Sequence, residues 1–303
     1  MCCLFLAASS TVAIAQTNVV DLVNPIIGTN GMGHTFPGAC VPFGLVQLSP
    51  DTDTIPHNVD GKYQPRSYEY CAGYQHKDSS IVGFSHTHFS GTGHSDLGDI
   101  LIMPTTGTLK LNPGTATNPD GGYRSRFSHD TEISRPGYYE VMLADYGVKA
   151  QLTTTQRAGI HKYTYPTNSE NQRIILDMIH GIYNYDGKVL WTNIRVENDT
   201  LVTGYRITNG WARTNYTYFA MSFSKPITHY GCEEKAKVDY RGGYAKFNMK
   251  ENFPDIGGRK IVAYFDFDPK MSDELEVKVA LSGVSTEAVS YTHLRAHETD
   301  QYL

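Results

Sequence analysis

Strict alternation of apolar and polar residues is the dominant pattern along this chain. It appears first at Val141/Leu143 and at Val148/Ala150/Leu152. It returns in three later runs, which are Leu201/Thr203/Tyr205/Ile207, Thr217/Phe219/Met221/Phe223 and Leu275/Val277/Val279/Leu281. A period of two places every second side chain on the same face of an extended strand. Each run is therefore predicted to be a half-buried β-strand.

Turn-forming residues end these runs and indicate how the strands connect. Asp145-Tyr146-Gly147, Asn198-Asp199 and Asn209-Gly210 each follow an alternating segment. Such residues tolerate the tight reversals of hairpins. No segment shows a convincing amphipathic helical pattern of three or more turns. Many short strands at this spacing predict an all-β fold, a large antiparallel β-sandwich, rather than alternating βαβ units.

Residues 24 to 125 have a different texture from the rest of the chain. Glycine and proline are dense there, polar and aromatic residues lie between them, and clean alternation is rare. Long irregular segments run over the surface and often carry function. The sandwich is therefore predicted to carry long glycine-rich loops, and the candidate site is sought in them.

Composition narrows the classes of partner. The formal net charge is −5 and no basic run occurs, which argues against nucleic acid as a partner. Beyond the first fifteen residues no apolar run is long enough to span a bilayer. Five cysteines are present without a CxxC pair, so buried free thiols are expected rather than a disulfide framework or a structural zinc site.

Both ends of the sequence look unlike the part between them. Residues 1–15 form an apolar run that ends in Ala13-Ile14-Ala15, which is typical of a secretory signal peptide, although its basic start is missing. The final stretch, residues 289–303, fits no periodicity established before it and is interpreted as a non-native tail. The expected domain is therefore residues 18–288, in a protein that continues further in nature.

A short histidine pattern in the second half of the loop region invites a metal interpretation. His86 and His88 are two positions apart, with His94 and Asp96 close behind. Imidazole is a common ligand of zinc-like ions, yet an HxH pair matches no specific metal signature. The favoured alternative is that these histidines form hydrogen bonds to loop backbone or to substrate hydroxyls.

Four carboxylates in the same region could supply a glycosidase acid and base. They are Asp51, Asp53, Asp96 and Asp99. An inverting pair needs carboxyl groups roughly 6.5–9.5 Å apart, which a sequence does not show. Turn and cap roles are favoured for all four.

The two longest glycine-rich stretches resemble glycoside hydrolase family 92, the calcium-dependent exo-α-mannosidases. The matching segments are VNPIIGTNGMGHTFPGACVPFGLVQLSPDT (residues 23–52) and AGYQHKDSSIVGFSHTHFSGTGHSDLGDILIMPT (residues 72–105). Weaker similarity extends through residues 124–166 and to the strand that ends VALSGVS. The resemblance implies an N-terminal β-sandwich, supersandwich-like, followed by a C-terminal (α/α)6 barrel that this chain lacks.

The resemblance also implies a division of the site between the two domains. The general acid, the general base and most ligands of Ca²⁺ are expected in the barrel, so no catalytic or metal residue is assigned here. The substrate-binding positions carried over are His34, Thr35, Phe36, Cys71, Tyr74, His86 and His88. The implied activity is inverting release of terminal mannose, α-1,2-linked, from glycans by an exported, periplasmic or secreted bacterial enzyme, with the fragment inactive alone.

Two other functions remain open from the residues themselves. The chain could be a stand-alone carbohydrate-binding β-sandwich with no catalytic partner. It could also be a metallohydrolase centred on His86, His88 and His94. Sugar affinity of the isolated chain would favour the first, and a stoichiometric transition metal would be required for the second.

Overall fold

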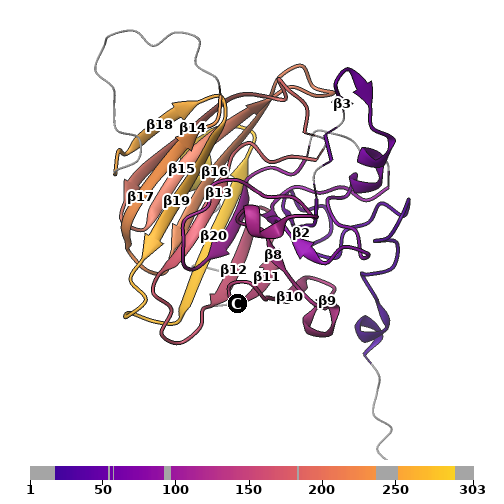
Figure 1. Cartoon of the computed structure of the whole chain (residues 1–303), viewed down its shortest axis with the longest axis horizontal. Coiled ribbons are helices and arrows are strands. Elements are labelled where there is room, and N and C mark those ends of the chain that lie inside the picture. The colour runs from indigo at the N-terminus through magenta and orange to yellow at the C-terminus, as the bar shows by residue number, and fades with distance from the viewer. Residues whose placement is uncertain are drawn as a thin grey trace, which may run out of the picture.

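Two large antiparallel sheets pack face to face in the computed structural model, which describes residues 18–53, 55–56, 58–91, 97–182, 184–236 and 252–290 (Figure 1). The order of the seven-stranded sheet is β1 (Ala39–Cys40), β2 (Gln47–Asp51), β6 (Gly83–Ser85), β7 (Leu101–Thr105), β13 (Gln172–Asp177), β19 (Ile261–Phe267) and β17 (Ile227–Glu234). The predicted all-β sandwich is confirmed.

The nine-stranded sheet is the second layer. Its order is β18 (Asp255–Gly258), β14 (Val189–Asn198), β15 (Leu201–Thr208), β16 (Asn215–Phe223), β20 (Glu274–Ser282), β12 (Ala158–Thr164), β11 (Val148–Thr154), β10 (Tyr138–Leu143) and β9 (Ile133–Arg135). The last strand in sequence, β20, lies in the middle. It pairs with β16 through Leu281 opposite Phe219 and with β12 through Val279 opposite Gly159.

Short elements complete the described chain. Two small strand pairs are β3 (Asn58–Val59) with β4 (Lys62–Tyr63) and β5 (Ser80–Ile81) with β8 (Ser125–Arg126). The helical turns are η1 (Val19–Leu22), η2 (Pro65–Tyr70), η3 (Pro119–Gly121), η4 (His129–Thr131) and α1 (Thr286–Ala288). Among the residues that the structure describes, no helix has the length and apolar character needed to cross a membrane.

Aromatic and aliphatic side chains from both sheets form the inter-sheet core. Phe223 of β16 meets Phe265 and Phe267 of β19 at ring-centroid distances of 5.7 and 4.9 Å. Phe84 of β6 faces Tyr163 of β12 at 6.3 Å. All of these rings are buried. Burial of such side chains is the main stabilising contribution in a sandwich of this size.

All the alternating runs form the predicted strands. In one of them, β15, the buried face is not the one that was predicted. In β10, β11, β16 and β20 the predicted apolar positions are buried. In β15 the fully buried positions include Val202, Gly204 and Arg206, while Tyr205 and Ile207 are only half-buried. Alternation alone did not reveal this reversal, because a charged residue, Arg206, occupies an inward position.

Residues 24–125 supply more of the sheet than their pattern indicates. Strands β2, β6 and β7 lie inside the seven-stranded sheet, and β7 is buried along its whole length. A strand covered on both faces has no polar alternation to display. The lack of alternation in this region therefore does not mean that it forms loops alone, because it includes central strands as well.

Three cysteines lie in the described chain, and none of the three forms a disulfide there. Cys71 and Cys232 are buried, while Cys40 is exposed, which corrects the expectation of burial for that thiol. Residues 1–15, the predicted signal peptide, lie outside the described residues. Of the predicted tail only residues 289 and 290 are described, and Val289 packs in a small buried cluster with Ala158, Ala220 and Ala280.

Candidate functional site

The two glycine-rich segments that stand out in the sequence lie against each other in the structure. We call residues 24–38 the first loop and residues 70–91 the second loop, although the second also contains the short strands β5 and β6; both belong to the indigo and violet part of the chain in Figure 1. The Gln75 side chain accepts from the Gly31 N–H at 2.8 Å and donates to its carbonyl at 2.9 Å. The Gly91 N–H donates to the His34 carbonyl at 2.9 Å. The two loops therefore form one surface feature.

Close approach of the backbone explains why glycine is required at two of these positions. Gly73 has φ +80°, and a Cβ there would lie 1.9 Å from Oδ1 of Asp51. Gly33 has no room for a Cβ either, because the Gly28 carbonyl oxygen would lie 2.1 Å away. Only glycine satisfies a positive φ and such contacts without strain. The loop backbones thus pack directly on the groups beneath them.

A buried carboxylate, Asp51 at the end of β2, binds two histidines beneath the second loop. His88 Nε2 lies 2.9 Å from Oδ1, and His180 Nε2 lies 2.8 Å from Oδ2. Burial raises the pKa of Asp51, but charge attraction and hydrogen bonds from His88 and His180 outweigh that effect and hold its pKa well below the usual range. Asp51 therefore stays ionised and orients both rings.

A second ion pair lies next to this one. Asp99 Oδ1 is 2.7 Å from Nη2 of Arg206, and both side chains are buried. The Thr87 hydroxyl donates to Oδ2 of Asp99 at 2.8 Å. Arg206 also donates from Nη1 to the carbonyl oxygen of His180, which links the two ion pairs. A buried guanidinium requires such compensation.

Asp177, at the end of β13, completes the set. It accepts from the Tyr123 hydroxyl at 2.5 Å and from the N–H groups of Ile179 and His180 at 2.7 and 3.0 Å. The resulting group, which we call the buried polar layer, consists of Asp51, His88, His180, Asp99, Arg206, Asp177 and Tyr123. It fixes the strand ends from which the loops rise.

A neutral histidine pair lies between the sheets. Tyr163 O–H donates to Nδ1 of His161 at 2.8 Å, and Nε2 of His161 lies 2.9 Å from Nε2 of His86. Nδ1 of His86 is 2.6 Å from the Ile100 carbonyl, so it must donate there and His161 must donate to Nε2. Burial lowers the pKa of His86 to about 4 and that of His161 well below its usual value. Both rings are therefore uncharged, and their tautomers follow from their partners.

The seven predicted substrate-binding residues divide into two sets. Thr35 and Phe36 are partly exposed on the first loop. The other five, which are His34, Cys71, Tyr74, His86 and His88, are buried. Phe36 nevertheless lies over the ring of His88, with centroids 5.4 Å apart. The first loop and part of the second therefore meet at one place, with Phe36 as its accessible face.

Three of the five buried residues are held by contacts within the protein. His34, whose φ is +53°, directs Nδ1 at the Gly91 carbonyl at 3.2 Å and meets the Tyr68 ring edge-on at 4.7 Å. The Cys71 thiol donates to the Tyr68 carbonyl at 2.6 Å. His86, within the inter-sheet pair, has no exposed surface and could not touch a ligand unless the sheets opened.

The histidine pattern that suggested a metal site divides between different partners. His86 bonds His161, while His88 bonds Asp51 and the Gln47 carbonyl. Both nitrogens of each ring are occupied, so neither offers a lone pair toward a common ion. His94 and Asp96 lie outside the described residues, so the predicted third group of that metallohydrolase site is not placed.

Turn and cap roles, which sequence reasoning favoured for the carboxylates, are wrong for Asp51 and Asp99. Asp51 and Asp99 are buried members of ion pairs, and Asp53 Oδ1 lies 3.3 Å from Nη2 of Arg124. Sequence reasoning also missed His180 and Arg206. No signal in the sequence marked Arg206, because alternation of apolar residues places it on the outer face of its strand, whereas the structure buries it.

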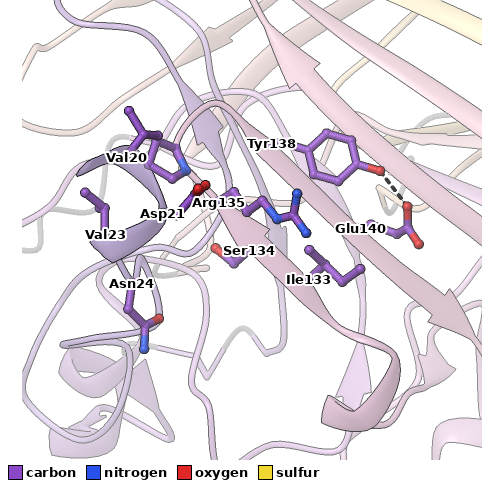
Figure 2. Close-up of a pocket in the computed structure, with 10 residues that line it drawn as sticks. Val20, Asp21, Val23, Asn24, Ile133, Ser134, Arg135, Tyr138 and Glu140 are labelled. Atoms are coloured by element: carbon purple, nitrogen blue, oxygen red, sulfur yellow. Dashed lines mark hydrogen bonds between the residues drawn. The ribbon is translucent and has the colours of Figure 1, made fainter. Parts of the chain in front are cut away.

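Exposed Phe89, at the end of the second loop, is not among the seven predicted binding residues. Its side chain is 53% exposed. An open groove elsewhere, between η1 and the β9–β10 hairpin, is lined by residues that include Val20, Asp21, Ile133 and Arg135 (Figure 2). Figure 2 shows Tyr138 donating to Glu140 beside it. None of the seven predicted residues lines that groove.

Known proteins share this fold and are similar to this chain in sequence. The family model described as the glycosyl hydrolase family 92 N-terminal domain matches residues 22–282. The family GH92 α-mannosidase BT3965 from Bacteroides thetaiotaomicron, solved with mannoimidazole, is 40% identical, with a TM-score of 0.77 over 90% of this chain. The family GH92 inverting mannosidase BT2199 from the same organism is 25% identical, with a TM-score of 0.68 over 91% of the chain.

The matches cover most of this chain but only about a third of each solved relative. This chain covers 33% of each of those two structures. A protein of Arthroderma benhamiae named as an uncharacterized secreted glycosidase is 29% identical over 170 residues, which are 53% of this chain and 19% of that protein. Because the family model spans most of the chain, the chain belongs to glycosyl hydrolase family 92 and carries the N-terminal domain of that family.

Proposed function

We propose that this chain is the non-catalytic part of an exo-acting, inverting α-mannosidase and that its two loops complete the sugar subsites. The observation that carries the proposal is the convergence of the first and second loops around Phe36, on a domain 40% identical to that of a solved α-mannosidase. That α-mannosidase was solved in complex with mannoimidazole, and BT2199, a second relative, is an inverting mannosidase.

The loop chemistry suits recognition of a sugar. Half-buried Phe36 and exposed Phe89 offer apolar faces, and the partly exposed Thr35 lies beside Phe36 in the first loop. Sugar sites combine a few such faces with a small number of fixed polar groups. The buried residues act indirectly, because the buried polar layer and the neutral histidine pair hold the loop backbones in place. This is preorganisation of the loops by the domain beneath them.

In this proposal the calcium ion and the catalytic carboxylates are supplied by a further domain outside this chain. Ca²⁺ prefers several oxygen ligands, carboxylates among them. Asp51 and Asp99, the carboxylates beneath the loops, are already bound to His88, His180 and Arg206. These two carboxylates are therefore not available to bind calcium, and the ion, when bound, would polarise sugar hydroxyls from the other domain.

Activity of separate and joined domains tests the proposal. The purified chain, given an aryl α-mannoside or α-1,2-linked mannobiose, is expected to release no mannose. The chain joined to the remaining domain of the BT3965 relative is expected to release β-mannose first, detected by the anomeric proton in NMR, because inversion changes the configuration. Turnover by the chain alone, or retention of configuration by the joined protein, would contradict the proposal.

A matched pair of phenylalanine variants locates the subsite within the joined protein. Phe36→Ala is expected to raise KM for the mannoside by tenfold or more, since an aromatic face against the sugar is lost. Phe43→Ala, which removes a fully exposed ring on the following turn, should leave KM unchanged. Equal effects of the two variants would show that the loops do not contact the sugar.

One observation favours the second function, a stand-alone carbohydrate-binding module. An aromatic row runs across the outer face of the nine-stranded sheet: Tyr216 stacks with Tyr218 at 6.0 Å, and Tyr218 meets Tyr205 at 5.6 Å. Exposed Trp191 lies two strands from Tyr216 in the same cross-strand register. Mannan affinity of the chain alone that is lost in Tyr216→Ala, and kept in Phe36→Ala, would support this function instead.

Export is part of the proposal. The apolar start of the chain and the name of the Arthroderma relative, a secreted glycosidase, support it. A bacterial host would then hold the enzyme in the periplasm or the medium. Fractionation of cells that express the chain with its residues 1–15, compared with a variant that lacks them, tests this. Equal cytoplasmic retention of both forms would contradict export.

A further inference from the structure

Two histidines and a glutamate lie together where the second loop meets the start of β9. His76 belongs to the second loop, His129 to η4, and Glu132 directly precedes β9. The two imidazole rings face each other with centroids 3.9 Å apart. Taking one ligand atom from each of the three residues, all three atoms lie within 4.8 Å of one another. None of these residues belongs to the buried polar layer.

The carboxylate of this group is held by a shell of hydroxyl donors. Tyr74 donates to both oxygens of Glu132, at 2.9 and 3.0 Å, and Tyr139 donates to Oε1 at 2.6 Å. The side chain of Glu132 is only 3% exposed. Buried donors that orient a ligating carboxylate are the usual surroundings of a protein metal site. The carboxylate is therefore fixed before any ion arrives.

The histidines, in contrast, remain accessible. His129 is 38% exposed in its side chain, and Nδ1 lies 2.6 Å from Oε2 of Glu132. An exposed histidine next to a buried carboxylate leaves a path for an ion from solvent. Two imidazoles and one carboxylate form the donor set of zinc enzymes and of non-haem iron sites, whereas calcium and magnesium prefer all-oxygen sets.

We propose that His76, His129 and Glu132 bind a divalent transition metal of the zinc type, with solvent completing the coordination. The ion ties the second loop to the strand β9 that follows η4, and so fixes the part of the loop that carries Tyr74. The site is separate from His86 and His88, whose ring nitrogens are occupied by other partners. It also differs in chemistry from the calcium ion expected in the other domain.

Titration of the full 303-residue chain, purified without a histidine tag, tests the site. Zn²⁺ is the calorimetric probe, and Co²⁺ is the spectroscopic probe because its visible absorption reports low-coordinate nitrogen and oxygen ligation. One equivalent of each ion is expected to bind. His129→Ala and Glu132→Gln should each weaken binding at least about tenfold. His129 is exposed, so its removal leaves the fold intact, as circular dichroism would verify.

His229 provides the matched control. It is exposed to a similar extent, at 42%, and lies beside an acidic partner, with Nδ1 3.5 Å from Oδ2 of Asp266. His229→Ala should leave both the stoichiometry and the affinity unchanged. Absence of binding to the unaltered chain would overturn the proposal. Binding that survives in His129→Ala, or that is lost equally in His229→Ala, would overturn it as well.

Discussion

Two buried regions of the molecule are built in opposite ways. The inter-sheet core is made of rings and aliphatic chains such as Phe223, Phe265 and Tyr163. The buried polar layer, under the loops, is held by ion pairs such as Asp51 with His88 and Asp99 with Arg206. Burial of apolar side chains stabilises the fold whatever their mutual orientation. Each polar side chain, in contrast, forms its hydrogen bonds only in one orientation. The polar layer therefore positions the loops.

Removing the charge at the centre of the polar layer should have the largest effect. Asp51→Asn leaves His88 and His180 without their carboxylate while the shape is kept, and breaking a buried ion pair costs about 3–5 kcal/mol of unfolding free energy. Urea denaturation measures this loss. Asp120→Asn, which breaks an exposed pair with Arg126, is the control and should leave the midpoint unchanged. A small effect at Asp51 would show that the layer does not stabilise the fold.

Acid should act on the neutral histidine pair between the sheets. The pKa of His86 is lowered to about 4, whereas an unfolded histidine titrates near 6.5. Between pH 6.5 and 4 the histidine is protonated in the unfolded chain but not in the folded one. This contribution to the free energy of unfolding is therefore fully present above pH 6.5 and declines as the pH falls toward 4. The loss is roughly 3 kcal/mol, at about 1.4 kcal/mol per unit of pKa.

Denaturation curves at several pH values separate this effect from the others. The double variant His86→Gln with His161→Gln should lack the slope between pH 6.5 and 4. Asp51 adds nothing in that window, because its lowered pKa places its loss of stability at more acidic pH, below the unfolded value near 3.9. A slope that survives in the double variant would assign it to other groups.

The close packing of the second loop on Asp51 is tested by glycine replacement. Gly73→Ala places a Cβ 1.9 Å from Asp51 Oδ1 at a positive φ. Gly187→Ala, also at positive φ but with nothing within 4 Å, carries the backbone strain alone. That strain is about 1 kcal/mol, and Gly73→Ala should cost about 2 kcal/mol more. Equal losses would mean that the loop moves aside freely.

The smallest expected effect concerns a single hydroxyl. Tyr163→Phe leaves Nδ1 of His161 without its donor, and an unsatisfied buried acceptor costs about 1–2 kcal/mol. Tyr230→Phe removes an exposed hydroxyl whose partner, the Asn252 carbonyl, water can replace. Its unfolding free energy should not change measurably. A silent Tyr163→Phe would show that the histidine pair has another proton arrangement.

The same contrast explains what the sequence could and could not predict. Apolar strands such as β20, with Val277 and Val279 on one face, are recognisable by their period, and the sandwich follows from them. The polar layer has no period, because Asp51, His88 and His180 come from three separate segments. Their partnership depends on the meeting of loops in space. The resemblance located the loops, yet it did not separate accessible Phe36 from buried His86.

Individual misassignments have the same origin. Arg206 lies at an inward position of β15, which alternation of apolar residues assigns to the opposite face. Strand β7 was not recognised, because burial on both faces removes the polar half of the pattern. In both cases the residue type depends on a neighbour that is distant in sequence, and a pattern read from adjacent residues does not include that neighbour.

The central position of β20 has a consequence for how the chain folds. Strands β18, β14, β15 and β16 form one half of the nine-stranded sheet, strands β12 to β9 form the other, and β20 alone joins the halves. Until β20 has paired with β16 and β12, both halves of the sheet carry an unpaired edge. Exposed edges invite pairing between chains, so a folding intermediate in which β20 is not yet in place is the stage most exposed to aggregation. A chain cut before β20 would lose the one strand that joins the two halves of its larger sheet.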